Sequence, residues 1–395
     1  MDSMTTLNKM EHSTEEVPQI PANAMLDILS RLPVKILCRF RCVSKLWRNY
    51  LSDPYFFELH HHHQSQQKPY FVFMSLFCDF DHRVSPSDVD LEFNTTVHLS
   101  SANNEGQPMS EFTKQVKVDC LLKISLLPSH NNLICLSTKN HIYICNPSIQ
   151  EFFELPAGSP FESFSGSVGF GYIPSTDEYK VVRLFYRRLD LDYSNNCVEG
   201  CEILTIRTST SYVSGSCSSW KVLEEDCPYV TDNFMAFVNG SLYWRIDSMC
   251  DKKDEDDYIL SFDLEAEKFW ILPPPPCVKV HGWFWLVEIG EELWLSQNGD
   301  DPLILDMWML RDWDVFVWVK EYSIDLRTMD AIGTLPSWYS GHPIDIRNEE
   351  ILILSFGERL DYYNIKTKTF THLGYVNHPF RHCYYRESFL SLRSI

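Results

Sequence analysis

Residues 21–54 read PANAMLDILSRLPVKILCRFRCVSKLWRNYLSDP, a stretch in which short helical patterns alternate with helix breakers. The apolar residues from Met25 to Leu32 recur every three or four positions, which is the spacing of one helix face. Pro33 ends this first helix, because a residue that precedes proline is pushed out of the α region. A second helix is expected from Val34 to Phe40, and a third after Ser44, whose side chain suits an N-cap.

The charged residues of this stretch are mostly basic. Between Asp27 and Asp53 there is no acidic residue, but there are six basic ones, namely Arg31, Lys35, Arg39, Arg41, Lys45 and Arg48. Three short helices cannot hide all of their apolar side chains from water. An apolar surface with a basic rim predicts a protein partner with an acidic surface. The alternative is a small helical subdomain that packs on the rest of the chain.

The order of these residues resembles the F-box of plant F-box proteins, as in Ile28-Leu29, Arg31-Leu32-Pro33 and the run from Arg39 to Lys45 followed by Trp47. Asn23 and Ile36 depart from the usual pattern. The resemblance implies docking onto the small acidic adaptor of an SCF-type (cullin-RING) ubiquitin ligase, and through it onto cullin. The residues that we expect to contact the adaptor are Pro21, Leu29, Leu32, Pro33, Val34, Leu37, Val43 and Trp47.

The composition of the 395 residues argues against several classes of partner and cellular location. The net charge of −20 argues against nucleic acid and against an anionic membrane surface as partners. The 13 cysteines form no CxxC pair, which is typical of reduced, buried thiols in a cytoplasmic or nuclear protein. No apolar leader or long apolar run predicts secretion or a membrane span. We expect no cofactor and no metal site.

The chain divides by composition into four parts. Residues 1–17 are polar and are expected to be a disordered tail, and residues 18–59 hold the three helices of the F-box. Residues 60–69 begin with four histidines and continue with glutamines, which predicts a low-complexity linker. From residue 70 to 390 the helical period gives way to short β-rich runs between turn residues, so an all-β domain is expected.

A repeat runs through the β-rich part. Residues 235–244 form a predicted hairpin around Asn239-Gly240, the strongest two-residue turn signal. Similar hairpins recur roughly every fifty residues, and each is followed by a second one, which is the spacing of a four-stranded β-propeller blade. The sequence therefore predicts a β-propeller of six or seven blades, the weakest of them between residues 70 and 122.

Several segments in this repeat resemble the C-terminal F-box-associated domain of plant F-box proteins. They include Cys145-Asn146-Pro147-Ser148, Gly169-Phe170-Gly171-Tyr172 and Asp177-Glu178-Tyr179-Lys180. The fold expected from the resemblance is kelch-like or propeller-like, although the paired glycines of kelch repeats are missing.

The longer loops of the predicted propeller are acidic and partly aromatic. Tight turns within each blade leave these loops on one face, where a partner can bind. The residues of this candidate substrate face are Asp254, Glu255, Asp256, Asp257, Asp300, Asp301, Trp338 and Tyr339. They predict a protein substrate with a basic segment, but a merely solubilising rim explains the acids about as well.

No catalytic motif is found: the sequence has no GxSxG, HExxH, phosphate-binding loop or dinucleotide fingerprint. We therefore expect no catalytic residues and a substrate-recognition subunit of a ubiquitin ligase rather than an enzyme. Two alternatives stay open. One is an adaptor-bound scaffold that marks nothing for degradation, and the other is a propeller hydrolase or oxidase with a dispersed site.

Overall fold

The computed structural model describes part of the chain, and the structural statements below refer to it. The described residues are 21–67, 70–77, 93–102, 108–118, 125–127, 132–138, 140–159, 167–188, 198–207, 216–217, 219–224, 227–228, 231–246, 259–276, 278, 284–301, 303–329, 341–355, 359–375 and 382–391. The chain separates into two compact units, Met1–Gln66 and Gln67–Ile395, each described here by itself.

The first unit is helical. Its helices are α1 (Ala22–Ser30), α2 (Val34–Phe40), α3 (Lys45–Tyr50) and α4 (Pro54–Ser65). Helix α3 begins as expected, because the Ser44 Oγ accepts a hydrogen bond of 3.1 Å from the Trp47 N–H. Asp53 caps α4 in the same way by accepting from the Tyr55 N–H at 2.9 Å, and Pro54 occupies the first helical position.

The expectation of three helices is therefore wrong, because α4 is a fourth helix that extends into the expected linker. Helix α4 packs against α1. Its inward positions include His60 and Gln64, which are buried although their residue types are polar. These polar residues interrupt the helical spacing of apolar residues in α4, so the sequence pattern did not predict the helix.

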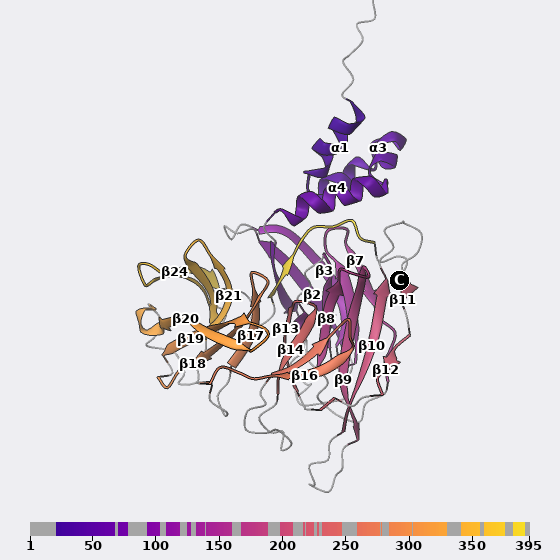
Figure 1. Cartoon of the computed structure of the whole chain (residues 1–395). Helices are drawn as coiled ribbons and strands as arrows, with labels where there is room; N and C mark the ends of the chain where they lie inside the picture. The colour runs from indigo at the N-terminus through magenta and orange to yellow at the C-terminus, as the bar shows by residue number, and fades with distance from the viewer. Residues whose placement is uncertain are drawn as a thin grey trace, which may run out of the picture. The chain divides into compact units, whose positions relative to one another are not determined.

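The second unit is all-β, as predicted, and consists of antiparallel sheets (Figure 1). Its first strands are β1 (Tyr70–Phe77), β2 (Phe93–Ala102), β3 (Pro108–Val118), β4 (Ser125–Leu127), β5 (Ile134–Ser137), β6 (Ile142–Asn146), β7 (Glu151–Glu154), β8 (Val168–Ile173), β9 (Glu178–Arg188), β10 (Val198–Arg207), β11 (Ser216–Cys217) and β12 (Lys221–Val222). The remaining strands are β13 (Thr231–Val238), β14 (Ser241–Ile246), β15 (Ile259–Asp263), β16 (Lys268–Leu272), β17 (Phe284–Ile289), β18 (Glu292–Asn298), β19 (Ile304–Asp312), β20 (Val317–Asp325), β21 (Gly341–Arg347), β22 (Glu350–Ser355), β23 (Arg359–Asn364), β24 (Thr369–Tyr375) and β25 (His382–Tyr385), with the short 3-10 helix η2 (Leu326–Thr328) after β20.

Five sheets are each built from one continuous stretch of chain: β4 to β7, β8 to β12, β13 to β16, β17 to β20 and β21 to β24. The remaining sheet has the order β25-β1-β2-β3, so strands from the two ends of the unit complete it together. The prediction of six or seven blades is thus too high, since in the described part of the chain five sheets are each formed by consecutive strands. Strand β25 is short and far from β1 in sequence, so no local turn signal could reveal their pairing.

The C-terminal segment is held in place by Asn146, which is the last residue of β6 and is buried. The Asn146 Nδ2 donates to the Ser388 carbonyl at 3.0 Å and to the Leu390 carbonyl at 2.8 Å. The Tyr385 hydroxyl donates to the Asn146 Oδ1 at 2.6 Å, and the Ser148 N–H donates to that hydroxyl at 3.0 Å. One side chain therefore satisfies several buried polar groups where the chain closes on itself.

The predicted Asn239-Gly240 hairpin is confirmed: Val238 at the end of β13 pairs with Ser241 at the start of β14. The turn residues have φ angles of 49° and 76°, in the left-handed region that favours asparagine and glycine. Gly169, on β8, is required for a different reason. A Cβ atom there would lie 2.7 Å from the Trp244 ring, so glycine allows the two neighbouring sheets to approach closely.

A second kind of turn joins the last two strands of several sheets. In the turn after β15, the Asp263 Oδ1 accepts from the backbone N–H groups of Glu265 and Ala266 at 2.8 and 2.7 Å. The turn ends at Glu267, whose φ of 54° is unusual for a residue with a side chain. The turns that begin at Asp312 and Asn364 repeat this capping, and they too end in left-handed residues, Phe316 and Lys368.

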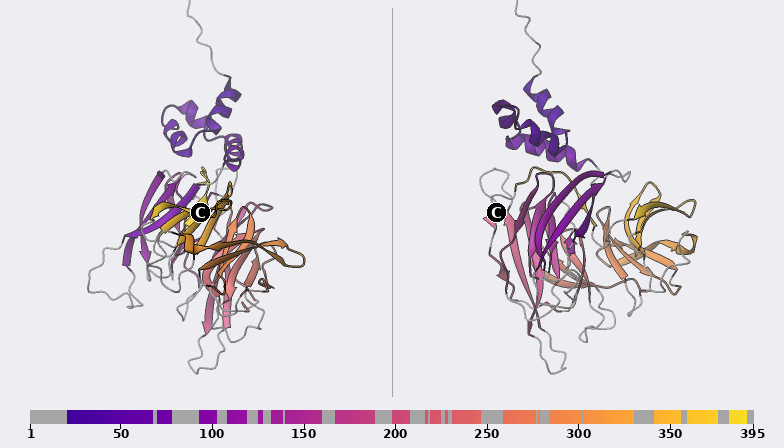
Figure 2. Two further views of the ribbon diagram at one scale, coloured as in Figure 1. Left: turned by 90° about the vertical axis from the view of Figure 1, so that its left-hand side faces the viewer. Right: turned by 180° about the vertical axis from the view of Figure 1, so that it is seen from behind.

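The core consists of apolar clusters that each combine neighbouring sheets. The largest contains Phe170, Val181, Trp244 and Phe262, all without measurable exposure to solvent. Aromatic contacts continue outward from the core: Phe316, in a turn of the sheet β17 to β20, stacks on Trp270 of β16 with ring centroids 5.8 Å apart. Figure 2 shows the same sheets from two further sides.

Candidate functional site

The eight residues expected to contact an adaptor differ widely in exposure. Leu29, Val34 and Leu37 are buried, together with Leu26 of α1 and Phe56 of α4. Leu32 and Trp47 are half-buried, and Pro21, Pro33 and Val43 are exposed. The edge of Trp47 meets Phe40 of α2, with ring centroids 5.2 Å apart. The structure thus divides the expected contact residues into a core group and a surface group.

The exposed apolar surface of the helical unit includes residues outside the predicted contact set. Val43, which belongs to the set, is 68% exposed. Three residues that were not predicted are also exposed, namely Leu46 (57%), Ile28 (53%) and Tyr55 (59%). Ile28 belongs to the predicted apolar face of α1, and Leu46 follows the predicted N-cap Ser44 by two positions. Exposed apolar residues such as Ile28 and Leu46 could have been predicted, because a short helix can turn only one apolar stripe inward. Val43 and Leu46 lie at the start of α3 and are close in sequence to the basic residues.

Part of the basic charge is used within the unit. The Arg31 guanidinium lies 3.1 Å from the Asp27 carboxylate, and this hydrogen bond lowers the pKa of Asp27. Arg41 donates to the Ser52 Oγ at 3.1 Å. Lys35, Arg39 and Lys45 are exposed, and none of the three forms an ion pair with an acidic residue inside the described ranges. These three basic residues lie close in sequence to the exposed Val43 and Leu46.

His60 fastens α4 to the segment that follows α1. Its Nε2 lies 3.3 Å from the Leu32 carbonyl oxygen. Burial lowers the pKa of His60 to about 4, because a charged imidazole would lose its hydration there. His60 is therefore neutral near pH 7. Next to it, the His63 Nε2 lies 3.4 Å from the Asp27 carboxylate. The histidines expected to form a linker thus contribute to the packing of the helical unit.

The candidate substrate face is described only in part. The residues Asp254, Glu255, Asp256, Asp257, Trp338 and Tyr339 lie outside the described residues. Asp300 is exposed, and Asp301 is half-buried. Asp301 forms an ion pair with Arg327 and accepts a hydrogen bond of 3.0 Å from the Leu303 N–H. Arg327 therefore neutralises one of the two described acids.

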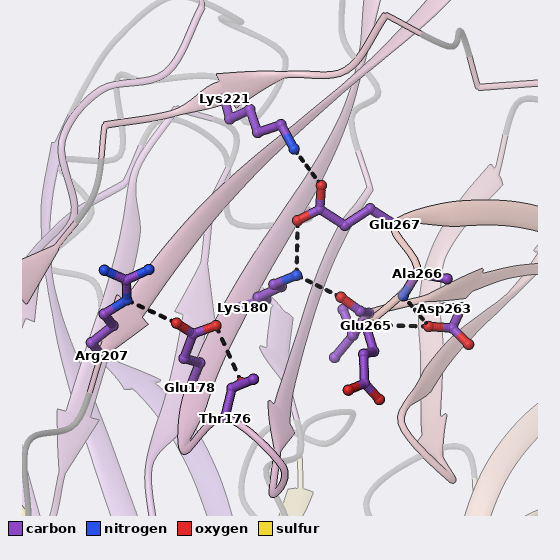
Figure 3. Close-up of polar contacts among 10 residues, drawn as sticks. Thr176, Glu178, Lys180, Arg207, Lys221, Asp263, Glu265, Ala266 and Glu267 are labelled. Carbon is purple, nitrogen blue, oxygen red and sulfur yellow. Dashed lines mark hydrogen bonds and ion pairs between the residues drawn. The ribbon is translucent and has the colours of Figure 1, made fainter.

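A polar network connects the sheet of β8 to β12 with the sheet of β13 to β16 (Figure 3). The Lys180 Nζ of β9 is buried and donates to the Leu264 carbonyl at 2.6 Å and to the Glu267 Oε1 at 2.8 Å. Lys221 of β12 reaches the other oxygen of Glu267 at 2.5 Å. Burial opposes ionisation of Glu267, but the hydrogen bonds from both lysines outweigh it and lower its pKa.

Figure 3 also shows Glu178, which bonds within its own sheet to Arg207 at 2.8 Å and to the Thr176 Oγ1 at 3.2 Å. The lysine contacts join the two sheets at the turn after β15, which ends in the left-handed residue Glu267. Its left-handed conformation costs on the order of 1 kcal/mol. The two lysine contacts offset this cost, so the network is a structural joint.

The most deeply buried ion pair joins Arg183 of β9 and Glu202 of β10, with 3.0 Å between Nε and Oε1. Burial lowers the pKa of Arg183 to about 10, although the Glu202 carboxylate opposes that shift. The Ser159 Oγ donates to Glu202 at 2.8 Å, and the Ser159 N–H lies 3.2 Å from both carboxylate oxygens. Both oxygens of the buried Glu202 carboxylate thus have hydrogen-bond donors within the fold, as in a structural ion pair.

Several cysteine thiols of the β domain are buried. Burial raises the pKa of the Cys135, Cys145 and Cys383 thiols, which disfavours the nucleophilic thiolate. In the described ranges, no cluster of three or more histidine, cysteine, aspartate or glutamate side chains is placed to hold a metal ion. Among the helices of the described ranges, none is long and apolar enough to cross a membrane.

Comparison with known families gives two matches. Residues 17–59 match the F-box domain, and residues 83–381 match the F-box associated beta propeller domain. The F-box protein DOR of Arabidopsis thaliana is 26% identical over 333 residues, which cover 81% of this chain and 78% of that protein. A second Arabidopsis thaliana F-box protein is 25% identical over 385 residues, covering 91% of this chain and 96% of that protein.

Among solved structures, a mutant of the Synechocystis apocarotenoid oxygenase is similar with a TM-score of 0.38 and 11% identity, over 64% of this chain and 58% of that one. A similarity this low has no bearing on function.

Proposed function

We propose a function on the premise that this chain belongs to the F-box proteins that carry an F-box associated β-propeller domain. The chain is the substrate-recognition subunit of an SCF-type (cullin-RING) ubiquitin ligase. Its helical unit docks onto the ligase adaptor and through it onto cullin, and its β domain holds a protein substrate.

The observation that supports docking most strongly is the pairing of exposed apolar and basic side chains around α3. Val43 and Leu46 are more than half exposed, and Lys35, Arg39 and Lys45 provide positive charge nearby in the sequence. Covering the apolar residues supplies affinity, while the charges accelerate encounter with an acidic adaptor.

The buried members of the predicted contact set act indirectly in this proposal. Leu29, Val34 and Leu37 hold the helices together and so fix the position of α3. Pro21, Leu32, Pro33 and Trp47 join Val43 as candidates for direct contact, because each is at least partly exposed.

The β domain contributes proximity rather than chemistry. A substrate held there has its lysines at a high effective concentration near the ubiquitin-charged enzyme. A substrate with a basic segment suits the net charge of −20, and Asp300 is one exposed acid of the candidate face within the described residues. The ligase function places the chain in the cytoplasm, the nucleus or both.

A pull-down of the purified chain with the adaptor and cullin pair tests the proposal. We expect binding by the wild type and loss of binding by the double variant Leu32→Ala with Pro33→Ala. Both side chains are at least partly exposed and lie outside the β domain, so the stability of that domain should change by less than about 1 kcal/mol. No binding by the wild type would refute the proposal. Partners whose abundance does not respond to proteasome inhibition would favour a non-degradative scaffold instead.

A further inference from the structure

Strand β20 carries an unusual set of exposed valines at its beginning. Val315, in the turn that precedes it, is 67% exposed, Val317 is 45% exposed and Val319 is 39% exposed. We call these three residues the valine row. Val317 and Val319 are two positions apart on one strand, so they point to the same face of the sheet. The residue between them, Trp318, has the opposite role: it packs on a core cluster and donates from its Nε1 to the Pro273 carbonyl at 2.9 Å.

The corresponding strands of other sheets show what this position normally holds. Each sheet ends in an outer strand, and the exposed residues are mostly polar: Glu154 on β7, Lys268 on β16, and Thr369 and Thr371 on β24. Val222 on β12 and Leu373 on β24 are single exposed apolar residues, which are ordinary on protein surfaces. Three exposed valines within five positions place more apolar side chains in solvent than the other outer strands do, which favours an interaction surface.

The backbone of β20 is available for pairing over a short length. The sheet order is β17-β18-β19-β20, so one edge of β20 faces no other strand of the described residues (Figure 1). The register with β19 shifts between Met307 and Trp308 and again between Leu310 and Asp312. The regular pairing of β20 is therefore divided into two short runs, Trp318 to Lys320 and Tyr322 to Asp325, and Val317 lies beyond the shift at Leu310 and Asp312. An added strand would form few hydrogen bonds, so the valine side chains would supply most of the contact.

The charges around the valine row are unbalanced. Arg311 pairs with Glu321 at 2.6 Å, and Lys320 pairs with Asp306 at 2.7 Å, so these four charges cancel. Asp312 and Asp314 are exposed and have no basic partner in the described part of the chain. Because both belong to the turn that leads into β20, the row has a negative end and a neutral end. A ligand aligned with the row would therefore place a basic group at the turn.

We propose that the valine row binds an extended segment of the protein substrate, with apolar residues at alternate positions and a lysine or arginine at the end that meets Asp312 and Asp314. This proposal rests on the function proposed above and assigns the substrate a place on the outer edge of the β domain. The period of two in the row matches an extended chain, and the two unpaired carboxylates set its direction.

The probe is a synthetic peptide in which valine and threonine alternate behind a pair of lysines, prepared with the lysines at either end. A second peptide carries aspartates in place of the lysines. Binding to the full-length chain is measured by fluorescence anisotropy. We expect one of the lysine peptides to bind, and the double variant Val317→Thr with Val319→Thr to weaken it about tenfold or more, because each threonine replaces a methyl group by a hydroxyl.

Two matched variants control this result. Val222→Thr changes an equally exposed valine of another outer strand and should leave binding unchanged. Asp312→Asn with Asp314→Asn should reduce the preference for lysine over aspartate peptides. Asparagine keeps the turn intact, because Asn364 caps the corresponding turn of another sheet.

Three results would overturn the proposal: no binding of either lysine peptide, equal binding by the Val317 and Val319 variant, or a wild-type dimer that this variant converts to a monomer. The dimer would mean that the row is covered by a second copy of the chain. Adaptor binding is measured on the same samples and should not respond to the valine substitutions. A wild type that binds the peptide but no adaptor would refute the ligase function and leave the peptide site standing.

Discussion

Replacing Val43 and Leu46 together by alanine should weaken adaptor binding without unfolding the helical unit. Burying a whole valine or leucine side chain is worth about 1.5–3 kcal/mol. With 68% of Val43 and 57% of Leu46 exposed, covering this exposed part contributes on the order of 1–2 kcal/mol per residue. Alanine keeps the Cβ atoms, so the double variant should lose about 2–3 kcal/mol, or roughly 30- to 150-fold in Kd.

Isothermal titration of the purified adaptor into the full chain measures this loss directly. The free energy of unfolding should change by less than about 0.5 kcal/mol, because neither side chain is buried. Leu37→Ala gives the opposite pattern, since a buried leucine costs about 2–5 kcal/mol when truncated and the whole unit loosens. Leu373→Ala, an exposed leucine of β24, is the matched control and should do nothing. An unchanged Kd for the Val43 and Leu46 variant would refute the assignment of the docking surface.

Three further predictions concern stability. His60 has a pKa of about 4 in the folded unit, whereas an unfolded histidine titrates near 6.5. The stabilisation from keeping His60 neutral is therefore fully present above pH 6.5, and the free energy of unfolding falls by about 3 kcal/mol as the pH drops to 4. Thermal unfolding of wild type and His60→Gln across this range checks the prediction, and equal pH profiles would contradict it. The pKa of Glu267 is lowered below its ordinary 4.5, so its contribution is present above that pH and is lost as the pH falls further; Glu267→Gln should therefore lower the Tm at pH 7 and have a smaller effect at pH 3. Asn146→Ala removes three hydrogen bonds of the C-terminal segment and should cost roughly 2–4 kcal/mol; limited proteolysis should then cleave near residue 390 faster than in the wild type, and an unchanged rate would contradict the anchoring role.

The helical unit shows which features can be read from sequence. The ends of α1, α2 and α3 follow from Pro33 and Ser44, which act through local backbone geometry. Helix α4 was not predicted because His60 and Gln64 occupy its inward positions, and residue type alone gives no sign that these two residues are buried. The exposure of the predicted contact residues could not be read from sequence for a related reason: the spacing of Ile28 and Leu29 places both on one helix stripe, but only packing decides which one remains exposed.

The β domain shows where local reasoning ends. The Asn239-Gly240 hairpin depends on neighbouring residues and was predicted correctly. The pairing of β1 with β25 joins residues more than three hundred positions apart, and it has no local signal. The same holds for the Lys180 and Glu267 contact, because the two residues approach only after their sheets pack. Exposure of the valine row also depends on sheet order, since an alternating Val317, Trp318 and Val319 predicts a strand but not its place at an edge.

The most direct test of the ligase function is native mass spectrometry of the full chain mixed with the adaptor and cullin. We expect a single ternary complex with one copy of each protein, and its loss when Val43 and Leu46 are replaced by alanine. Only free chain beside an intact adaptor and cullin pair, observed with the wild type, would contradict the ligase function.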